Sequence, residues 1–253
     1  MAGAKERMRM MDMELCRTEA IARNIGAVKD KIARSAERAG RSAGEITLLA
    51  ATKTRGYGEI RAAIAAGIGA AGENRVQELR DKCALGAYDG CPLHFIGPLQ
   101  TNKIKYLIGN AAMIHSVDSA RLAEAISALS ARAGVVTDVL IEVNIGGEAS
   151  KSGVAPRETA ALAQQVAGVE AVRLRGLMTV PPAGEDARGY FAAMRALFES
   201  LRGGLPEAFN VLSMGMSHDF ETAVEEGATI VRVGSAIFGP RPAPHMIGKE
   251  QQL

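Results

Sequence analysis

The chain has 253 residues, of which 47% are hydrophobic, 23% are charged and only 4% are aromatic, and its formal net charge is +2. This length suits one large α/β domain, which can bury a substantial core without disulfides or metal ions. Acidic and basic residues are interspersed and aromatic residues are scattered. The composition therefore argues against a nucleic-acid-binding surface or a platform for stacking bases.

The cysteines and the N-terminus bear on the compartment. Cys16, Cys83 and Cys91 form no C-x-x-C pair, and an odd number cannot all pair within the chain. A reduced, intracellular setting fits them best. The N-terminus lacks the apolar core of a signal peptide, and no uninterrupted apolar stretch is long enough to span a bilayer. We expect a soluble cytoplasmic protein without a membrane contact.

The first predicted element is a long helix over about residues 10–39. Ile21, Ile25, Val28 and Ile32 recur at helical spacing and form one apolar stripe. Gly40 supplies a stop signal, because glycine readily adopts the backbone conformation that ends a helix. We therefore expect residues 1–40 to form a helical extension before the main fold.

Short apolar runs then alternate with amphipathic segments. The predicted strands are 46–52, 68–72, 94–96, 112–115, 135–143, 172–177, 209–212 and 228–233. Helices are expected near 57–67, 73–84, 101–109, 122–133, from 156, 191–201 and 218–226, with a helical turn at 234–238. Eight strand–helix units predict a single-domain (β/α)8 TIM barrel over 1–253, with 241–253 as a C-terminal tail. An open doubly wound sheet is the alternative.

Barrel proteins place their functional residues at the C-terminal ends of the strands. Lys53 follows the first predicted strand. A lysine amine forms a Schiff base with a carbonyl compound once it loses its proton, and partial burial favours the neutral amine. An ordinary surface or ion-paired lysine is the alternative interpretation.

Two segments rich in glycine and serine follow the last two strands. These are 213–217, with the sequence SMGMS, and Gly234-Ser235. Small residues let backbone N–H groups approach an anion, and barrels frequently build a phosphate site from these two loops. The alternative is a serine N-cap for the helix that begins near His218.

Arg232 lies inside the last predicted strand, where a solvated arginine is not expected. A buried guanidinium needs an acceptor. The acceptor could be the carboxylate of Glu142 or of Glu73, or a ring nitrogen of a cofactor.

Two further polar residues could line a pocket. Asn74 could donate to a ring hydroxyl or carbonyl, although a helix N-cap would also explain it. His94 could stack or hydrogen-bond inside the barrel, although a lone half-buried histidine is more often a satisfied core residue. The spacing of Cys83, Cys91 and His94 matches no metal-binding pattern.

Several segments together resemble the YggS/PROSC family of pyridoxal 5'-phosphate (PLP) homeostasis proteins. The likeness runs in order over about residues 20–241. The segments are LLAATKT (48–54), GENRVQE (72–78), HFIGPLQTNK (94–103), GLM (176–178), LSMGMS (212–217) and VRVGSAIFG (231–239).

The resemblance implies a barrel like the N-terminal domain of bacterial alanine racemase, with PLP held as a Schiff base on Lys53. It implies PLP binding and vitamin B6 homeostasis without established catalysis, with PLP-dependent apo-enzymes as further partners. We expect a monomer. The resemblance also implies contacts for the phosphate from Ser217, Gly234, Ser235 and the Met214 and Gly215 backbone, for the pyridine nitrogen from Arg232, and for the rest of the pocket from Asn74 and His94.

Three positions depart from the pattern of that family: Arg55, Arg75 and His218. We place them at the rim of the pocket, where they affect partner contacts. Two alternatives stay open. A PLP-dependent amino-acid racemase would need a second acid or base, for which the candidates are Tyr57, Tyr106, His94 and His115. A Schiff-base aldolase without PLP would share the barrel and the lysine.

Overall fold

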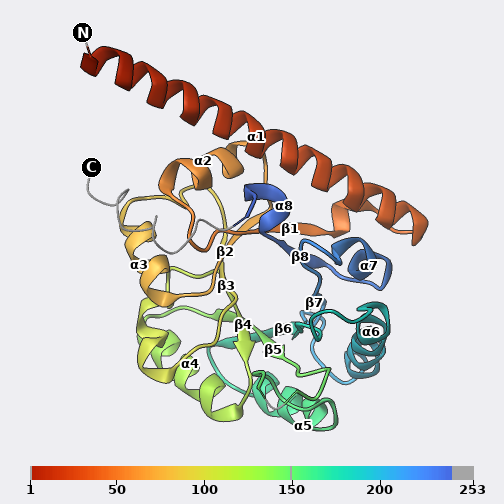
Figure 1. Cartoon of the computed structure of the whole chain (residues 1–253). Coiled ribbons are helices and arrows are strands. Elements are labelled where there is room, and N and C mark those ends of the chain that lie inside the picture. The colour runs from red at the N-terminus through yellow and green to blue at the C-terminus, as the bar shows by residue number, and fades with distance from the viewer. Residues whose placement is uncertain (1, 149, 241–253) are drawn as a thin grey trace.

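The computed structural model describes residues 2–148 and 150–240, and the predicted tail 241–253 lies outside them. Eight parallel strands close into a barrel in sequence order, because β1 pairs with both β2 and β8 (Figure 1). This confirms the (β/α)8 barrel and excludes the open sheet. The strands are β1 (Thr47–Ala51), β2 (Ala70–Glu73), β3 (Leu93–Phe95), β4 (Met113–Val117), β5 (Thr137–Glu142), β6 (Val172–Met178), β7 (Val211–Ser213) and β8 (Ile230–Val233).

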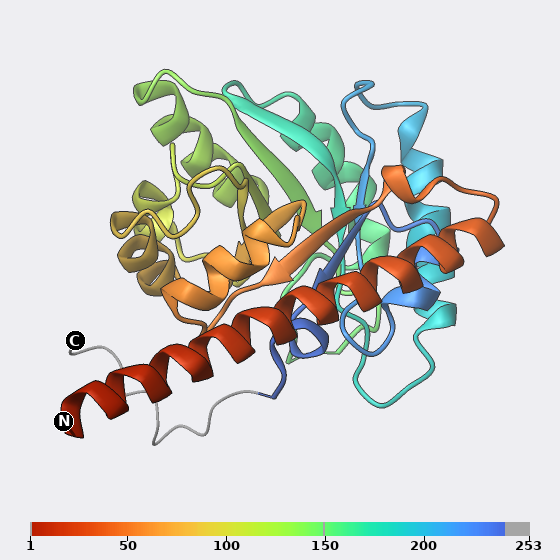
Figure 2. The same ribbon diagram turned by 90° about the horizontal axis from the view of Figure 1, so that it is seen from above.

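The helices form a ring around the strands (Figure 1), and Figure 2 shows the barrel from the side with α1 lying along it. No helix in the described ranges is both long and apolar enough to cross a membrane. The helices are α1 (Ala2–Arg38), α2 (Tyr57–Ala65), α3 (Val76–Ala84), α4 (Ala120–Arg132), α5 (Pro156–Ala167), α6 (Arg188–Arg202), α7 (Phe220–Glu225) and α8 (Ser235–Phe238), with the 3-10 helices η1 (Ala43–Glu45) and η2 (Thr101–Tyr106).

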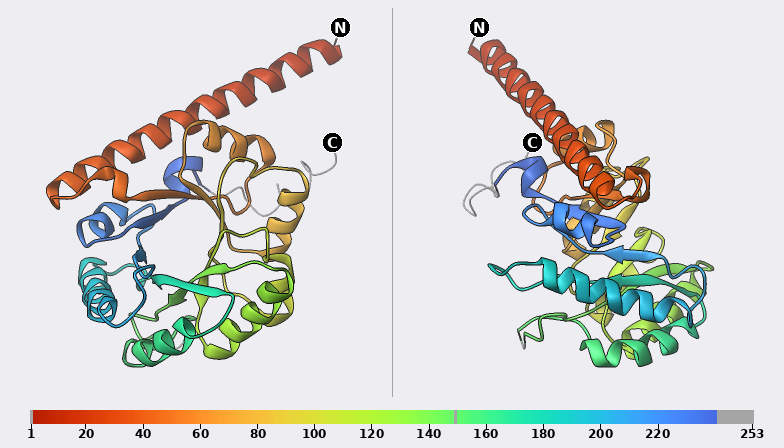
Figure 3. Two further views of the ribbon diagram at one scale, coloured as in Figure 1. Left: turned by 180° about the vertical axis from the view of Figure 1, so that it is seen from behind. Right: turned by 90° about the vertical axis from the view of Figure 1, so that its right-hand side faces the viewer.

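Helix α1 closes the ring beside β8 and β1. The helix that follows β8 has only four residues, and α1 packs instead against α2, α7 and α8. Its predicted apolar stripe is buried, from Ile21 to Ile32. Arg17 and Asn24 donate to the carbonyls of Phe238 and Ile237, over 2.7 and 2.8 Å, and so fasten α8. The N-terminal end of α1 extends past the barrel (Figure 3).

The strands separate two apolar clusters. The outer cluster joins the outward faces of the strands to the helices. The inner cluster takes one residue from each of seven strands: Leu49, Ala70, Met113, Leu140, Met178, Val211 and Ile230. Side chains alternate across a strand, so residues two positions after an inner residue also point inward. This places His115, Ser213 and Arg232 inside the barrel.

Several predicted boundaries differ from the structure. Helix α1 starts at Ala2 rather than near residue 10, because the segment before the stripe consists mostly of good helix formers such as Ala, Met, Glu, Lys and Arg. The helix expected from residue 73 begins at Val76, since Glu73 ends β2. The helix expected over 101–109 is the 3-10 helix η2, and β7 extends to Ser213.

Candidate functional site

The loop after β1 carries Lys53 at the C-terminal face of the barrel. Its side chain is half-buried, between buried Thr52 and half-buried Thr54. Thr54 has a φ of 61°, a left-handed conformation that is unfavourable for a β-branched residue. Its backbone N–H donates to Glu78 Oε2 over 2.7 Å, which helps to hold this conformation. The lysine therefore sits on a fixed and strained turn.

The buried carboxylate of Glu73 stabilises the same loop through hydrogen bonds. Glu73 Oε1 accepts hydrogen bonds from Thr52 Oγ1, Lys82 Nζ and Tyr88 Oη, each over 2.7 Å. Lys82 Nζ also donates to the Thr52 carbonyl over 2.9 Å. Burial, together with the charge of Glu73, raises the pKa of Tyr88, so the phenol keeps its proton as a donor. We call Glu73, Lys82 and Tyr88 the β1-loop clamp.

Asn74 follows β2 at the same end of the barrel. The N-cap of α3 is Arg75, so Asn74 is not the helix cap that the sequence left open. Its Oδ1 is buried and has no hydrogen-bond partner in the described chain. The loop after β3 presses against it, because a Cβ atom on Gly97 would lie 2.2 Å from the Asn74 carbonyl oxygen. Asn74 therefore has a polar atom available in a confined place.

The two glycine- and serine-rich segments lie together. Ser217 Oγ accepts from the N–H groups of Gly234 and Ala236, each over 3.2 Å. The N-cap of α7 is Asp219, so Ser217 does not cap that helix. A Cβ atom on Gly234 would lie 3.5 Å from that of Ala51, two residues before Lys53. The serine-bearing turns and the lysine loop thus meet at one edge.

Met214 differs from its expected role. Its backbone N–H donates to the Ile230 carbonyl over 3.1 Å, and its side chain is buried in the outer cluster. This geometry does not support a phosphate contact through the Met214 backbone. The next residue, Gly215, has a φ of 91°, and a Cβ there would lie 2.5 Å from that of Ala223. The turn therefore needs glycine.

Arg232 is 5% exposed inside the barrel. Its Nη1 donates to Ser213 Oγ over 2.7 Å, and its Nη2 donates to the Thr179 carbonyl over 2.8 Å. Neither carboxylate considered from the sequence forms an ion pair with it within residues 2–148 and 150–240. Burial lowers the pKa of Arg232 to about 10, partly offset by Glu142, and the guanidinium stays charged at neutral pH.

Glu142 ends β5 at the same mouth. Its burial, with the charge of Asp118, raises its pKa to about 7, while Arg232 acts in the opposite direction. Glu73, the other carboxylate considered, belongs instead to the β1-loop clamp. The mouth thus holds one charged guanidinium and one carboxyl group that titrates near neutral pH.

His94 and His115 are in contact inside the barrel. His94 Nδ1 lies 2.9 Å from His115 Nε2, and His115 Nδ1 lies 3.1 Å from Ser213 Oγ. Burial lowers the pKa of His94 to about 4 and that of His115 well below its usual value. Both imidazoles are therefore neutral at pH 7. The sequence placed both histidines at the ends of predicted strands, but it did not indicate that the two rings are in contact.

The three departures from the family pattern lie in different places. Arg55 is not at a rim: it is 5% exposed and donates to the carbonyls of Gly239 and Pro240, over 2.9 and 3.2 Å. Arg75 and His218 are exposed. Arg55 therefore ties the lysine loop to the end of α8.

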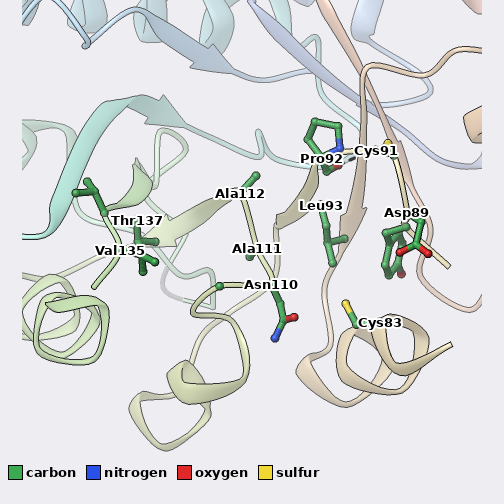
Figure 4. A pocket seen from close by; sticks show the side chains of 14 residues that line it. Cys83, Asp89, Cys91, Pro92, Leu93, Asn110, Ala111, Ala112, Val135 and Thr137 are labelled. Carbon is green, nitrogen blue, oxygen red and sulfur yellow. Dashed lines mark hydrogen bonds between the residues drawn. The ribbon is translucent and has the colours of Figure 1, made fainter. Parts of the chain in front are cut away.

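Two cavities of the described chain lie away from Lys53. A cavity of about 490 Å³ opens at the N-terminal ends of β3, β4 and β5, between Cys83, Leu93 and Thr137 (Figure 4). That is the opposite face of the barrel from Lys53. A second cavity, of about 470 Å³, lies between the loops after β3 and β4, next to Asp118 and Arg121. The candidate site is thus identified by its polar groups rather than by cavity volume.

Comparison with known proteins identifies the family. Residues 20–242 match the family model of the alanine racemase N-terminal domain. A pyridoxal phosphate homeostasis protein of Aquifex aeolicus is 46% identical over 221 residues, which are 86% of this chain and 96% of that protein.

Solved structures support the same family assignment. The structure of PipY from Synechococcus elongatus with PLP bound is 31% identical with a TM-score of 0.75, and the match covers 87% of this chain and 100% of that one. An alanine racemase from Corynebacterium glutamicum shares the fold alone, at 19% identity and a TM-score of 0.69, over 90% of this chain and 63% of that one. The chain therefore belongs to the alanine racemase N-terminal domain family, together with the proteins named pyridoxal phosphate homeostasis protein.

Proposed function

We propose that this chain binds PLP as a Schiff base on Lys53 and takes part in PLP homeostasis. One observation carries the proposal: the lysine loop, the two serine-bearing turns and Arg232 meet at one barrel mouth. The backbone of Gly234 lies against Ala51, and Ser217 bridges to Gly234 and Ala236. An aldehyde that carries a phosphate needs an amine and an anion site at the same mouth.

The residues present fit such a cofactor. Ser217 Oγ accepts from Gly234 and Ala236, which leaves the hydroxyl proton of Ser217, with the hydroxyl of Ser235, as donors of the kind that bind phosphate. The partnerless Asn74 Oδ1 suits a ring hydroxyl, which is a donor. Arg232 has five N–H donors, and its two hydrogen bonds leave others for an acceptor.

PLP, when bound, supplies an electrophilic aldehyde and an electron-accepting ring. The chain's own residues determine how far the ring accepts electrons. Arg232 is charged at neutral pH, so it can donate to a pyridine nitrogen but cannot protonate it readily. An unprotonated ring is a weaker electron acceptor. This favours a protein that binds the cofactor rather than one that uses it to convert an amino acid.

We further propose that the protein is a monomeric carrier or regulator rather than an enzyme, with PLP-dependent apo-enzymes as recipients. The candidate acid/base groups support this. His94 and His115 are buried, neutral and bonded to each other. Tyr57 is 51% exposed at the start of α2. A PLP-dependent racemase remains the second candidate because alanine racemase shares the fold.

The test is spectroscopic. PLP-loaded protein should absorb at about 420 nm, as PLP Schiff bases with lysine do. Borohydride reduction and peptide mapping should then place the adduct on Lys53, and Lys53→Ala should lose it. Lys103→Ala is the matched control, since Lys103 is exposed on η2 at the same face. An adduct mapped to another lysine contradicts the assignment, and steady racemisation that requires Lys53 supports the enzyme.

A further inference from the structure

Four buried polar side chains from four strands form one chain of contacts across the barrel. Arg232 Nη1 donates to Ser213 Oγ over 2.7 Å, and Ser213 Oγ lies 3.1 Å from His115 Nδ1. His115 Nε2 lies 2.9 Å from His94 Nδ1. Exposure is 0% at Ser213 and His115 and 7% at His94, so water does not compete for these bonds. We call these residues the inner polar chain.

Arg232 fixes the donor at one end of the inner polar chain. A guanidinium only donates, so Ser213 Oγ accepts from Arg232. A hydroxyl oxygen can accept twice, so the next bond is our assignment: Ser213 gives its single proton to His115 Nδ1. His115, being neutral, then carries its proton on Nε2 and donates to His94 Nδ1. In this assignment His94 accepts on Nδ1 and carries its own proton on Nε2. Every donor points away from Arg232.

The surrounding charges favour this arrangement. Arg232 repels a second positive charge on His115, and burial disfavours charge on both rings. Asp138 on β5 attracts a proton to His94, but it is already paired with Arg173 and Arg175 over 2.6 Å each. Burial outweighs that attraction.

The inner polar chain ends at Arg232, whose guanidinium lies at the mouth of the barrel. Ser213 is the last residue of β7 and Thr179 directly follows β6, so both partners of the guanidinium lie at the C-terminal ends of their strands. The planar guanidinium is held at both Nη atoms and cannot rotate without breaking a bond. Its remaining donors therefore keep one orientation.

We propose that Ser213 and His115 are positioning residues that hold Arg232 as an oriented donor toward the pyridine nitrogen of the cofactor. This inference rests on the proposed function, because the nitrogen belongs to PLP. It adds that the orientation of Arg232 is set from the opposite wall of the barrel, through β4 and β3. His94 then acts on the cofactor through Arg232.

The first test uses the full chain without PLP and reads side chains by ¹⁵N NMR. Wild type should show His94 and His115 neutral at pH 7 with the proton on Nε2, and slow rotation of the Arg232 guanidinium. Ser213→Ala should speed that rotation, while Ser213→Thr, which keeps the hydroxyl, should leave it slow. Rotation unchanged in Ser213→Ala, or a proton on Nδ1 of either ring, overturns the proposal.

The second test titrates PLP into the same variants. Ser213→Ala should bind PLP about tenfold more weakly, as expected from losing the hydrogen bond to the charged Arg232. His115→Leu removes the partner that orients Ser213 and should weaken PLP binding in the same direction. Ser213→Thr should stay within about twofold of wild type. Equal PLP affinity in Ser213→Ala and wild type refutes the positioning role. If wild type itself does not bind PLP, the proposed function fails, and the NMR result still decides the inner polar chain.

Discussion

The β1-loop clamp gives a prediction that follows directly from burial. Lys82→Met removes the cation 2.7 Å from Glu73, a carboxylate with no exposed surface. Removing one partner of a buried pair typically costs about 3–5 kcal/mol, because the remaining charge is left uncompensated. Here Thr52 and Tyr88 still donate to Glu73, so we expect the lower end, about 3 kcal/mol.

For a chain of this length, that loss should lower the melting temperature by about 6–12 °C. The assay is denaturant and thermal unfolding of the PLP-free protein. The double variant Glu73→Gln/Lys82→Met removes both charges and should recover part of the loss. Lys82→Met should also slow borohydride trapping of PLP, since Lys82 holds the Thr52 carbonyl next to Lys53. A change below about 0.5 kcal/mol in Lys82→Met would refute the reasoning.

Three further predictions concern titration and close packing. The pKa of Glu142 is raised to about 7, so unfolding free energy should fall as pH rises from 4.5 to 7, and Glu142→Gln should flatten that slope in denaturant titrations. The pKa of His94 is lowered to about 4, so the free energy of unfolding should fall as the pH drops from 6.5 toward 4. If His94→Gln shows the same loss of unfolding free energy over this pH range, the prediction is wrong. Gly97→Ala should cost about 1–3 kcal/mol, because its Cβ would lie 2.2 Å from the Asn74 carbonyl; Gly56→Ala, with nothing within 4 Å, is the unfolding control.

Periodicity in the amino-acid sequence was enough to predict the fold class. Alternating apolar runs and amphipathic segments require parallel strands, and eight such units close a barrel, as the pairing of β1 with β8 confirms. The stripe from Ile21 to Ile32 likewise identified the buried face of α1. These predictions were correct because the spacing of apolar residues shows which face of a helix or strand is buried. The same pattern recurs over many residues, so a single exceptional residue does not obscure it.

Sequence motifs also indicated which loops carry the site, but not how its polar groups pair. Glu73 and Glu142 were equal candidates for Arg232, yet Glu73 binds Lys82 and Arg232 binds Ser213 and Thr179. Such pairing depends on which side chains face each other across the barrel, a matter of register between distant strands.

The tertiary structure alone decided three further points. Ser217 accepts hydrogen bonds from the turn after β8 rather than capping the helix that follows it. Arg55 is buried and hydrogen-bonded to the end of α8 rather than exposed at the rim. His115 contacts both His94 and Ser213. Each contact joins segments far apart in the chain. Local spacing predicts burial and turns, but a hydrogen bond between distant residues exists only once closure of the barrel has brought the strand ends together.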